Sequence, residues 1–396
     1  MEKPPRPATI HILLPAMIYL DHNATTPVCA GALDAMMPFL SGCWANPSSG
    51  YRFARVARDA VTKARGQVAS LLGVDAEEIV FTGCGTESIN TAMRSAMAVF
   101  PERRHIVTCA TEHDATLACA AELERAGCEV TRLRVGPDGS LDPGELKAAL
   151  RPGQTALVSL MWANNETGVV HPIAEFAALA GEAGALFHSD AVQAAGKVPL
   201  DLNSAAVHYA SLSGHKLHAP KGIGVLFVRK TARFHPLLVG GGQENGRRSG
   251  TLNVPGIVAL GAAAEAASQH LKSDAGSLHP LRDRLESALQ DRIPGLHIHG
   301  QNTERLPNTS NFRIEGADAQ GMVLLLDNAG VCVSTGSACA TGSIKPSHVL
   351  TAMGLTSRQA RETLRLSLSR QTTAEEIERA IEAVAAAAQK LRVTRK

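Results

Sequence analysis

The stretch Ser213-Gly214-His215-Lys216 stands just before an apolar run, Ile223-Gly224-Val225-Leu226-Phe227-Val228, and the rest of the sequence is interpreted outward from it. A lysine held at the edge of a strand by small and hydrogen-bonding residues can form a Schiff base with a carbonyl cofactor. Lysines in surface loops are common, so this stretch alone is more often structural than catalytic. Its interpretation depends on the polar stretches elsewhere in the chain.

Predicted strands and helices alternate over most of the chain up to Val228. Short apolar runs bounded by glycine or polar turns indicate strands, and apolar residues at helical spacing indicate helices. We expect strands at 78–81, 105–109, 130–135, 155–161, 185–188, 207–212 and 223–228. We expect helices beginning near residue 27 and at 51–72, 85–97, 115 onward and 173–183. This alternation is typical of an α/β fold with a mostly parallel, doubly wound sheet.

The pattern changes after residue 254 and predicts a smaller α+β domain at the C-terminal end. Two helices, 254–271 and 278–289, are expected on either side of Gly276. Strands at 296–299, 310–314 and 331–334, a helix at 321–326 and a closing helix at 374–391 come next. We therefore expect a large domain at 19–270 and a small domain at 271–396, with residues 19–30 able to pack against the small domain.

The composition excludes several classes of function. Hydrophobic residues make up 45% of the 396 residues and charged residues 19%, which is typical of an ordinary soluble globular protein. The net charge is +2 and like charges form no block, so we expect neither a nucleic-acid partner nor a membrane partner. The eight cysteines are scattered, without zinc-site spacing, which favours a reducing compartment and no permanent metal site.

The N-terminal residues differ in composition from the rest of the chain. Three of the first seven residues are prolines, and the apolar patch at 10–18 is short for a signal peptide. We interpret residues 1–18 as a disordered extension. Met17 is a plausible alternative start, which leaves open whether residues 1–16 are translated.

Two polar turns, at 21–26 and 46–50, carry more polar groups than a connection needs, so both are candidates to line a site. A third turn, Thr82-Gly83-Cys84-Gly85-Thr86, lies between a predicted strand and a predicted helix. That arrangement presents backbone N–H groups and a positive dipole end to a phosphate. The alternative is a tight strand-to-helix turn capped by Thr86.

Polar residues also come directly after three other predicted strands. His113 comes after the strand at 105–109, Asn165 after that at 155–161, and Asp190 at the end of that at 185–188. Sites gather at such strand ends in open α/β sheets. A carboxylate at Asp190 could keep a pyridinium nitrogen protonated, or could merely cap a following helix.

Three further features lie toward the C-terminus. The glycine-rich, basic loop at 240–251 suits a phosphate, or is a flexible surface loop. Cys339 lies among glycine, serine, alanine and threonine, a composition that would place its thiol on a mobile, solvated loop as a nucleophile. Arg365, in an alternating strand, could bind a substrate carboxylate or form an ordinary salt bridge.

Ten segments in order resemble the cysteine desulfurases of the nitrogen-fixation and iron–sulfur housekeeping type, which are class V aminotransferase-like, fold-type I pyridoxal-phosphate (PLP) enzymes. The segments are YLDHNATTP (19–27), NPSSG (46–50), FTGCGTES (81–88), TEHDA (111–115), NNETG (164–168), FHSDAVQAAGK (187–197), SGHKLHAPKG (213–222), GGGQENGRRSGT (240–251), STGSACATGS (334–343) and PSHVLTAMG (346–354). Agreement at ten ordered sites is far beyond chance.

The resemblance implies a role for each matching residue. Lys216 would be the Schiff-base lysine, Asp190 the partner of the ring nitrogen, and His113 the residue that stacks on the ring and moves protons. The remaining implied cofactor ligands are Gln193 and Asn165 near the ring oxygen, Gly85, Thr86, Ser213 and His215 at the phosphate, and Thr251 at the phosphate of a neighbouring subunit in a homodimer.

The resemblance also implies the chemistry. Arg365 would hold the carboxylate of L-cysteine, with Asn46 and Asn165 assisting. Cys339 would attack the substrate sulfur, giving a persulfide and L-alanine, and its loop looks like the longer class that delivers sulfur to an acceptor such as an iron–sulfur scaffold. Whether Cys339 also transiently ligates iron shared with a scaffold stays open, as does the acceptor: nitrogenase assembly, general cluster assembly or tRNA thiolation.

Two departures and two alternatives remain. Cys84 stands where serine or glycine is usual, and Leu252 where glutamate is frequent, and neither removes a group that the chemistry needs. A related selenocysteine lyase or aminotransferase would keep its activity without Cys339. A non-catalytic dimer that serves as a scaffold or regulator is disfavoured because four residues are retained together: Lys216, Asp190, His113 and Cys339.

Overall fold

The computed structural model describes residues 17–335 and 346–393. Its largest sheet has seven strands in the order β2-β8-β7-β6-β5-β3-β4. These are β2 (Ile79–Thr82), β3 (His105–Cys109), β4 (Glu129–Leu133), β5 (Thr155–Ser159), β6 (Leu186–Asp190), β7 (Tyr209–Ser213) and β8 (Gly224–Val228). Only β8 runs antiparallel to its neighbours, β2 and β7. The expected α/β fold with a mostly parallel sheet is therefore confirmed.

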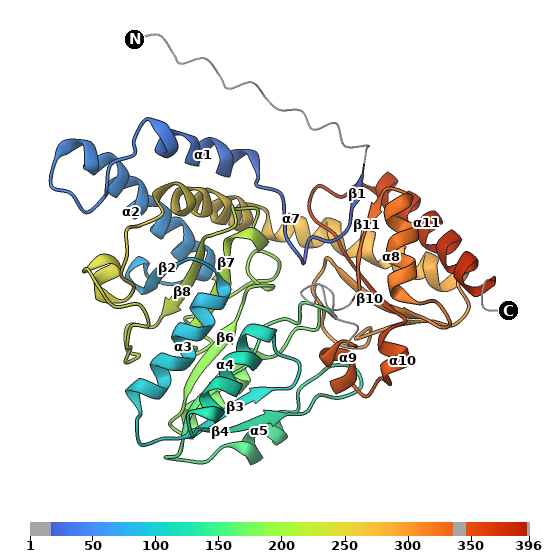
Figure 1. Ribbon diagram of the computed structural model, residues 1–396, viewed down its shortest axis with the longest axis horizontal. Coiled ribbons are helices and arrows are strands. Elements are labelled where there is room, and N and C mark those ends of the chain that lie inside the picture. Colours follow the sequence, from blue (N-terminus) through green and yellow to red (C-terminus); the bar gives the residue numbers. More distant parts are fainter. Residues whose placement is uncertain (1–16, 336–345, 394–396) are drawn as a thin grey trace, which may run out of the picture.

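Helices cover both faces of this sheet (Figure 1). They are α1 (Ala30–Ser41), α2 (Arg52–Leu72), α3 (Gly85–Val99), α4 (Asp114–Arg125), α5 (Pro143–Ala149), α6 (Ile173–Glu182) and α7 (Val254–Arg292). Side chains alternate across each strand, so Val80 packs in the core beneath α3 and α4 while Phe81 packs in the core beneath α2, α6 and α7. Burial on both faces explains why these strands are continuous apolar runs in the sequence.

The expected break at Gly276 is wrong. α7 is one helix of 39 residues that passes through both Gly276 and Pro280. Its N-terminal half packs in the core of the large sheet through Leu260, whereas its C-terminal half packs in a second core through Leu285. Burial at both ends outweighs the helix cost of Gly276, about 1 kcal/mol, and the larger cost of Pro280, about 3 kcal/mol. The expected boundary between residues 270 and 271 thus falls inside a helix, which Figure 1 shows running from α2 toward α11.

The second core is built on a four-stranded antiparallel sheet in the order β12-β13-β10-β9. Its strands are β9 (Leu296–Ile298), β10 (Thr309–Ile314), β12 (Ser334–Thr335) and β13 (Thr363–Ser367), and its helices are α8 (Ala319–Asn328) and α11 (Ala374–Val393). The short helices α9 (His348–Ala352) and α10 (Ser357–Ala360) form a small separate cluster. The predicted strand at 331–334 is in fact two short strands, because β11 (Val331–Cys332) pairs instead with β1 (Ile18–Tyr19). Through that pair the N-terminal segment joins the second core.

Two smaller expectations also differ from the structure. The first helix begins at Ala30 rather than near Pro27, with Cys29 as its N-cap residue. The connection between β6 and β7 consists of turns, so Asp190 caps no helix there. In the part of the chain that the structure describes, no helix has both the length and the apolarity needed to cross a bilayer.

Candidate active site

A cavity of about 310 Å³ opens at the carboxyl ends of the central strands. Seven chain segments reach it: the turns after β2, β3 and β5, the ends of β6 and β7, the turn at Asn23 and Ala24, and strand β13. This is the edge where open α/β sheets bind ligands. Ten of the thirteen predicted site residues line it: Gly85, Thr86, His113, Asn165, Asp190, Gln193, Ser213, His215, Lys216 and Arg365.

Three predicted residues are not in this cavity. Asn46 is exposed, and its side-chain oxygen accepts a hydrogen bond from the nearby Ser48 N–H at 3.0 Å. Thr251 is also exposed, at the end of the glycine-rich loop. Cys339 lies outside the residues that the structure describes.

Lys216 enters the cavity from a short 3₁₀ turn (Gly214–Lys216) that directly follows β7. Its Nζ atom donates hydrogen bonds to the backbone oxygens of Asn23 and Ala24, at 2.5 and 2.6 Å. The polar turn near the N-terminus is therefore brought against the lysine across about 190 residues of intervening chain. These contacts fix where the amine lies.

One corner of the cavity is shaped for an anion. α3 begins at Gly85, and its N-cap residue, Cys84, makes no side-chain capping bond. The Cys84 side chain thus does not cap the first N–H groups of this helix. Ser213, from the end of β7, lines the same cavity. A Cβ atom on Gly85 would lie 2.9 Å from Cγ2 of Val192, so a larger residue would disturb the wall. The expected phosphate position has the shape and donors such a group needs.

Asp190 lies at the buried end of β6, and its Oδ1 accepts a hydrogen bond from Val192 N at 2.9 Å. Burial raises the pKa of Asp190, while the neighbouring His113 and Lys216 act in the opposite direction. A positively charged partner in the cavity would stabilise its ionised form. A protonated ring nitrogen is such a partner.

His113 is the N-cap residue of α4, and its Nδ1 accepts a hydrogen bond from Ala115 N at 3.1 Å. A neutral imidazole with Nδ1 as acceptor carries its proton on Nε2. His215 also lines the cavity, and its Nδ1 lies 3.1 Å from Thr25 Oγ1. Burial, with Lys216, Lys221 and Lys197 nearby, lowers the pKa of His215 to about 4, so its ring is neutral near pH 7.

Arg365 extends into the site from the middle of β13 and is only 1% exposed. Its Nη1 donates to Asn165 O at 2.9 Å, and its Nη2 lies 2.6 Å from Asp21 Oδ1. Nε has no hydrogen-bond partner among the described residues. The guanidinium thus forms a salt bridge, as one interpretation expected, and its binding of a substrate carboxylate stays a prediction.

Two polar residues at or beside the cavity were not predicted. Asn23 contacts Lys216, Gln193 and Thr309, so it connects both cores to the cavity. Its only signal in the sequence is its position in a polar turn. Glu112 is fully buried beside His113 and accepts a hydrogen bond from Met161 N at 2.6 Å. Burial, together with Asp190, raises its pKa well above the usual range.

The glycine-rich loop is not a loose surface loop. Glu244 within it forms two hydrogen bonds with Arg65 of α2, at 2.8 and 2.5 Å, and accepts a third from Phe81 N. Arg248 pairs with Glu87 in the first turn of α3. The loop is thus fixed against the strand and helix that form the anion corner, with Thr251 exposed at its end.

Comparison with known proteins agrees with this geometry. The family model for class V aminotransferases matches residues 18–380. The chain belongs to the class V aminotransferase family. It is 51% identical over 377 residues to a protein named cysteine desulfurase 2 from Trichormus variabilis, covering 95% of this chain and 94% of that one. It is 47% identical over 370 residues to the cysteine desulfurase NifS of Azotobacter vinelandii, covering 93% and 92%.

A solved structure titled NifS-like protein superposes with a TM-score of 0.88 at 37% identity, covering 94% of this chain and 99% of that one. The expected class V, NifS-type desulfurase on a fold-type I scaffold is therefore confirmed. The family depends on PLP. Among residues 17–335 and 346–393, no group of three or more histidine, cysteine or acidic side chains is arranged to hold a metal.

Proposed function

We propose that the chain binds PLP at Lys216, removes the sulfur atom of L-cysteine, releases L-alanine and leaves a persulfide on Cys339. The observation that carries this proposal is the convergence of Lys216, Asp190, His113 and Arg365 on one cavity of about 310 Å³. These four residues come from distant parts of the sequence, and each supplies a different group that the reaction needs.

The cavity fits the cofactor by its shape and its donors. The phosphate would lie beside Gly85, in space that a Cβ atom would reduce. Thr86, Ser213 and His215 would be its further ligands. Asp190 would hold the ring nitrogen, and the Nζ atom of Lys216 would be the point of covalent attachment. Bound there, PLP supplies an electron sink that weakens the bonds at the substrate's Cα and, in turn, its Cβ–S bond.

The protein's own groups would bind and orient the substrate. The guanidinium of Arg365 would hold the α-carboxylate of L-cysteine, with the side chain of Asn165 beside it. The Nδ1 atom of His113 accepts the Ala115 N–H, so proton transfer falls to its Nε2 atom. This atom can give its proton to the substrate and later take a proton back. With its carboxylate held by Arg365 and its reacting atoms beside His113, the substrate would have one orientation, and its thiol would point in one fixed direction.

Sulfur transfer then requires a nucleophile. The Cys339 thiolate would form an S–S bond with the substrate sulfur while the Cβ–S bond breaks. The carbon atom retains the electron pair of that bond, accepts a proton, and becomes the methyl group of alanine. A reductant or an acceptor thiol would afterwards take the outer sulfur atom and restore the thiol.

A homodimer is the proposed form of the enzyme. Seven large apolar side chains of α1, α2 and their connection are exposed, although such chains are usually buried: Leu33, Met37, Leu40, Trp44, Tyr51, Phe53 and Val56. We propose that a second copy of the chain covers this surface. In that dimer the exposed Thr251 would reach the phosphate in the partner subunit's cavity.

The sulfur acceptor and the compartment are also proposals. We propose that the chain acts in the cytoplasm and passes sulfur to an iron–sulfur scaffold or another sulfur-acceptor protein. All the described cysteines (Cys29, Cys43, Cys84, Cys109, Cys119, Cys128 and Cys332) are free thiols, which supports a reducing compartment.

The test of the proposed function is product formation by the PLP-loaded protein. L-cysteine and a reductant are added, and alanine and sulfide are quantified for wild type, Lys216→Ala and, as a control, Lys147→Met on the exposed side of α5. We expect equimolar alanine and sulfide from wild type and the control, and neither from Lys216→Ala. Pyruvate and ammonia in place of alanine would contradict the proposal.

A further inference from the structure

Lys197 is a buried lysine that the proposed chemistry does not use. It lies in the connection between β6 and β7, four residues after Gln193. Its Nζ atom donates to Gln193 Oε1 at 2.7 Å and to Asn23 Oδ1 at 3.3 Å. Lys197 does not line the large cavity, whereas both of the side chains it contacts do.

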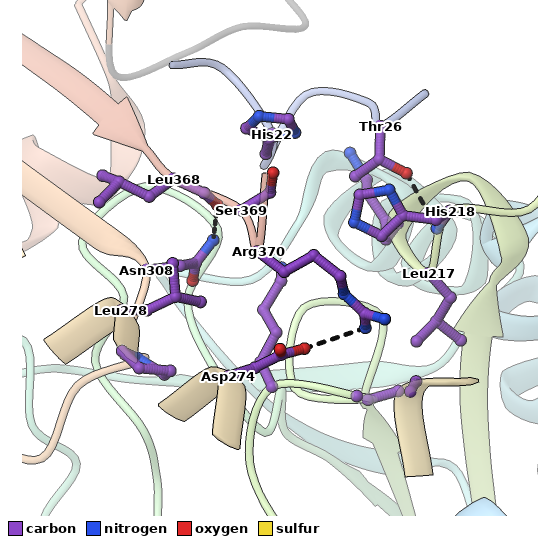
Figure 2. A pocket seen from close by; sticks show the side chains of 16 residues that line it. His22, Thr26, Leu217, His218, Asp274, Leu278, Asn308, Leu368, Ser369 and Arg370 are labelled. Carbon is purple, nitrogen blue, oxygen red and sulfur yellow. Dashed lines mark hydrogen bonds and ion pairs between the residues drawn. The ribbon is translucent and has the colours of Figure 1, made fainter. Parts of the chain in front are cut away.

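A second, smaller cavity of about 40 Å³ is shown in Figure 2. Lys197 lines it, and Lys216 lines both cavities. Figure 2 shows Asp274 paired with Arg370 there, at 3.0 Å, so this carboxylate has its own cationic partner. Within the described part of the chain, the Lys197 amine donates its hydrogen bonds to the two amide side chains and not to a carboxylate.

Those two contacts determine which way each amide points. An amine offers donors, so the atom of Gln193 that faces Lys197 must be the carbonyl oxygen Oε1. The NH₂ group of Gln193 is then directed to the other side, where Nε2 donates to Asn23 O at 3.0 Å, the same oxygen that accepts from Lys216. Asn23 is oriented in the same way, because its Oδ1 faces Lys197 and its Nδ2 donates to Thr309 Oγ1 at 2.9 Å.

We propose that Lys197 is a positioning residue that holds Gln193 with its NH₂ group, rather than its oxygen, directed toward the cofactor side of the cavity. This inference rests on the proposed function, in which Gln193 lies near the ring oxygen of PLP. A ring oxygen needs a donor, and an amide that could rotate freely would also present its own oxygen. Lys197 thus disfavours the orientation in which the Gln193 oxygen faces the cofactor, and it does so without contacting the cofactor.

The charge of Lys197 is not needed for this role. Burial, with Lys216 and Arg365 nearby, lowers its pKa to about 7. A neutral amine still carries two N–H groups. These are enough to donate one hydrogen bond each to Gln193 Oε1 and Asn23 Oδ1. The orientation of Gln193 is therefore maintained in both protonation states.

The test is a double-mutant cycle read by cofactor binding. The variants are Lys197→Met, which keeps the length and removes the donors, Gln193→Leu, and the two combined, with the exposed Lys147→Met as a charge-matched control. Two quantities are measured for each: the visible absorption spectrum of the bound PLP and its dissociation constant. Folding is checked by circular dichroism.

We expect Lys197→Met to weaken PLP binding about tenfold, as the loss of one oriented hydrogen bond would. It should also shift the absorption band in the same direction as Gln193→Leu does. The double variant should match Gln193→Leu alone, because the lysine acts through the glutamine. Lys197→Gln, which keeps an N–H donor, should lie closer to wild type than Lys197→Met and serves if the latter does not fold.

Either of two results would overturn the inference. In the first, Lys197→Met has the same PLP spectrum and the same dissociation constant as the wild type. In the second, the loss of PLP affinity in the double variant equals the sum of the losses in the two single variants. Failure of the proposed function has a different signature. In that case the wild-type protein itself would show no absorption band and no saturable binding of PLP.

Discussion

The Nη2 atom of Arg365 lies 2.6 Å from Oδ1 of Asp21, which joins the middle of β13 to the segment just after β1. A parallel backbone β-bridge between Asp21 and Ser367 holds the two segments side by side next to this ion pair. Because the arginine is almost fully buried, its direction is fixed before any substrate arrives. The pair therefore places a cation at the edge of the cavity that also contains the anion corner at Gly85.

The first prediction concerns that cation. Arg365→Lys keeps the charge but loses the planar fork that can hold both Asp21 and a substrate carboxylate. We expect KM for L-cysteine to rise about tenfold or more, with a smaller change in kcat, because a charge-assisted hydrogen bond is lost. Steady-state kinetics of alanine formation measures both constants.

Arg313→Lys is the matched control, since Arg313 lies in β10 and pairs with Glu362 away from the cavity. It should leave KM unchanged. An Arg365→Lys enzyme with the wild-type KM would show that the substrate carboxylate binds elsewhere.

The second prediction concerns the anion corner. In Gly85→Ala the added methyl group would lie 2.9 Å from Cγ2 of Val192, so the wall beside the phosphate must move. We expect PLP to bind about tenfold more weakly, the equivalent of roughly 1.4 kcal/mol, while the protein still folds. Equilibrium dialysis against PLP gives the dissociation constant.

Gly181→Ala in α6 is the control for this change, because a Cβ atom there would meet nothing within 4 Å. It should leave PLP binding unchanged and slightly stabilise the helix. If both alanine variants bind PLP as the wild type does, the phosphate does not lie beside Gly85.

The third prediction is a pH dependence of stability. His188 is completely buried between Ser159 and Ser211, at 2.8 and 2.9 Å, and links β5, β6 and β7. Burial lowers its pKa from 6.5 to about 3 in the folded chain. Its contribution to stability is therefore complete above pH 6.5 and is lost as the pH falls, because only the unfolded chain takes up the proton.

Between pH 7 and pH 5 this residue should account for about 2 kcal/mol of lost unfolding free energy, at roughly 1.4 kcal/mol per pH unit below the ordinary histidine pKa. His188→Gln keeps hydrogen-bonding groups but does not titrate. Urea titrations at both pH values, at one fixed protein concentration, should show a smaller acid-induced loss in the variant. Equal losses in the two proteins would contradict the assignment.

Most of the predicted residues that line the cavity could be found because they follow a strand of the large sheet. His113, Asp190 and Ser213 come at or just after strand ends, and the parallel strands carry these ends to the same edge. The sequence contains this information locally, as a switch from apolar to polar residues.

The contacts that hold those residues could not be predicted in the same way. Asn23 lies 193 residues from Lys216 and 285 from Asn308, so its contacts depend on how the two cores are brought together. The continuity of α7 likewise depends on burial at both of its ends, and the local signal at Gly276 indicated a break instead. Thr251 and Asn46 lie outside the cavity of a single chain, so their expected roles stay predictions.

The central claim is that sulfur passes from L-cysteine to Cys339, and the most direct measurement compares wild type with Cys339→Ala. Each PLP-loaded protein is given L-cysteine, and alanine and sulfide are quantified in the presence of a reductant. The peptide that contains Cys339 is then analysed by mass spectrometry, without reductant. The account predicts equimolar products and one added sulfur atom on that peptide in wild type, and the loss of both in the variant, with PLP still bound. Undiminished alanine and sulfide from Cys339→Ala would contradict it, because the sulfur would then leave by a route that does not involve this thiol.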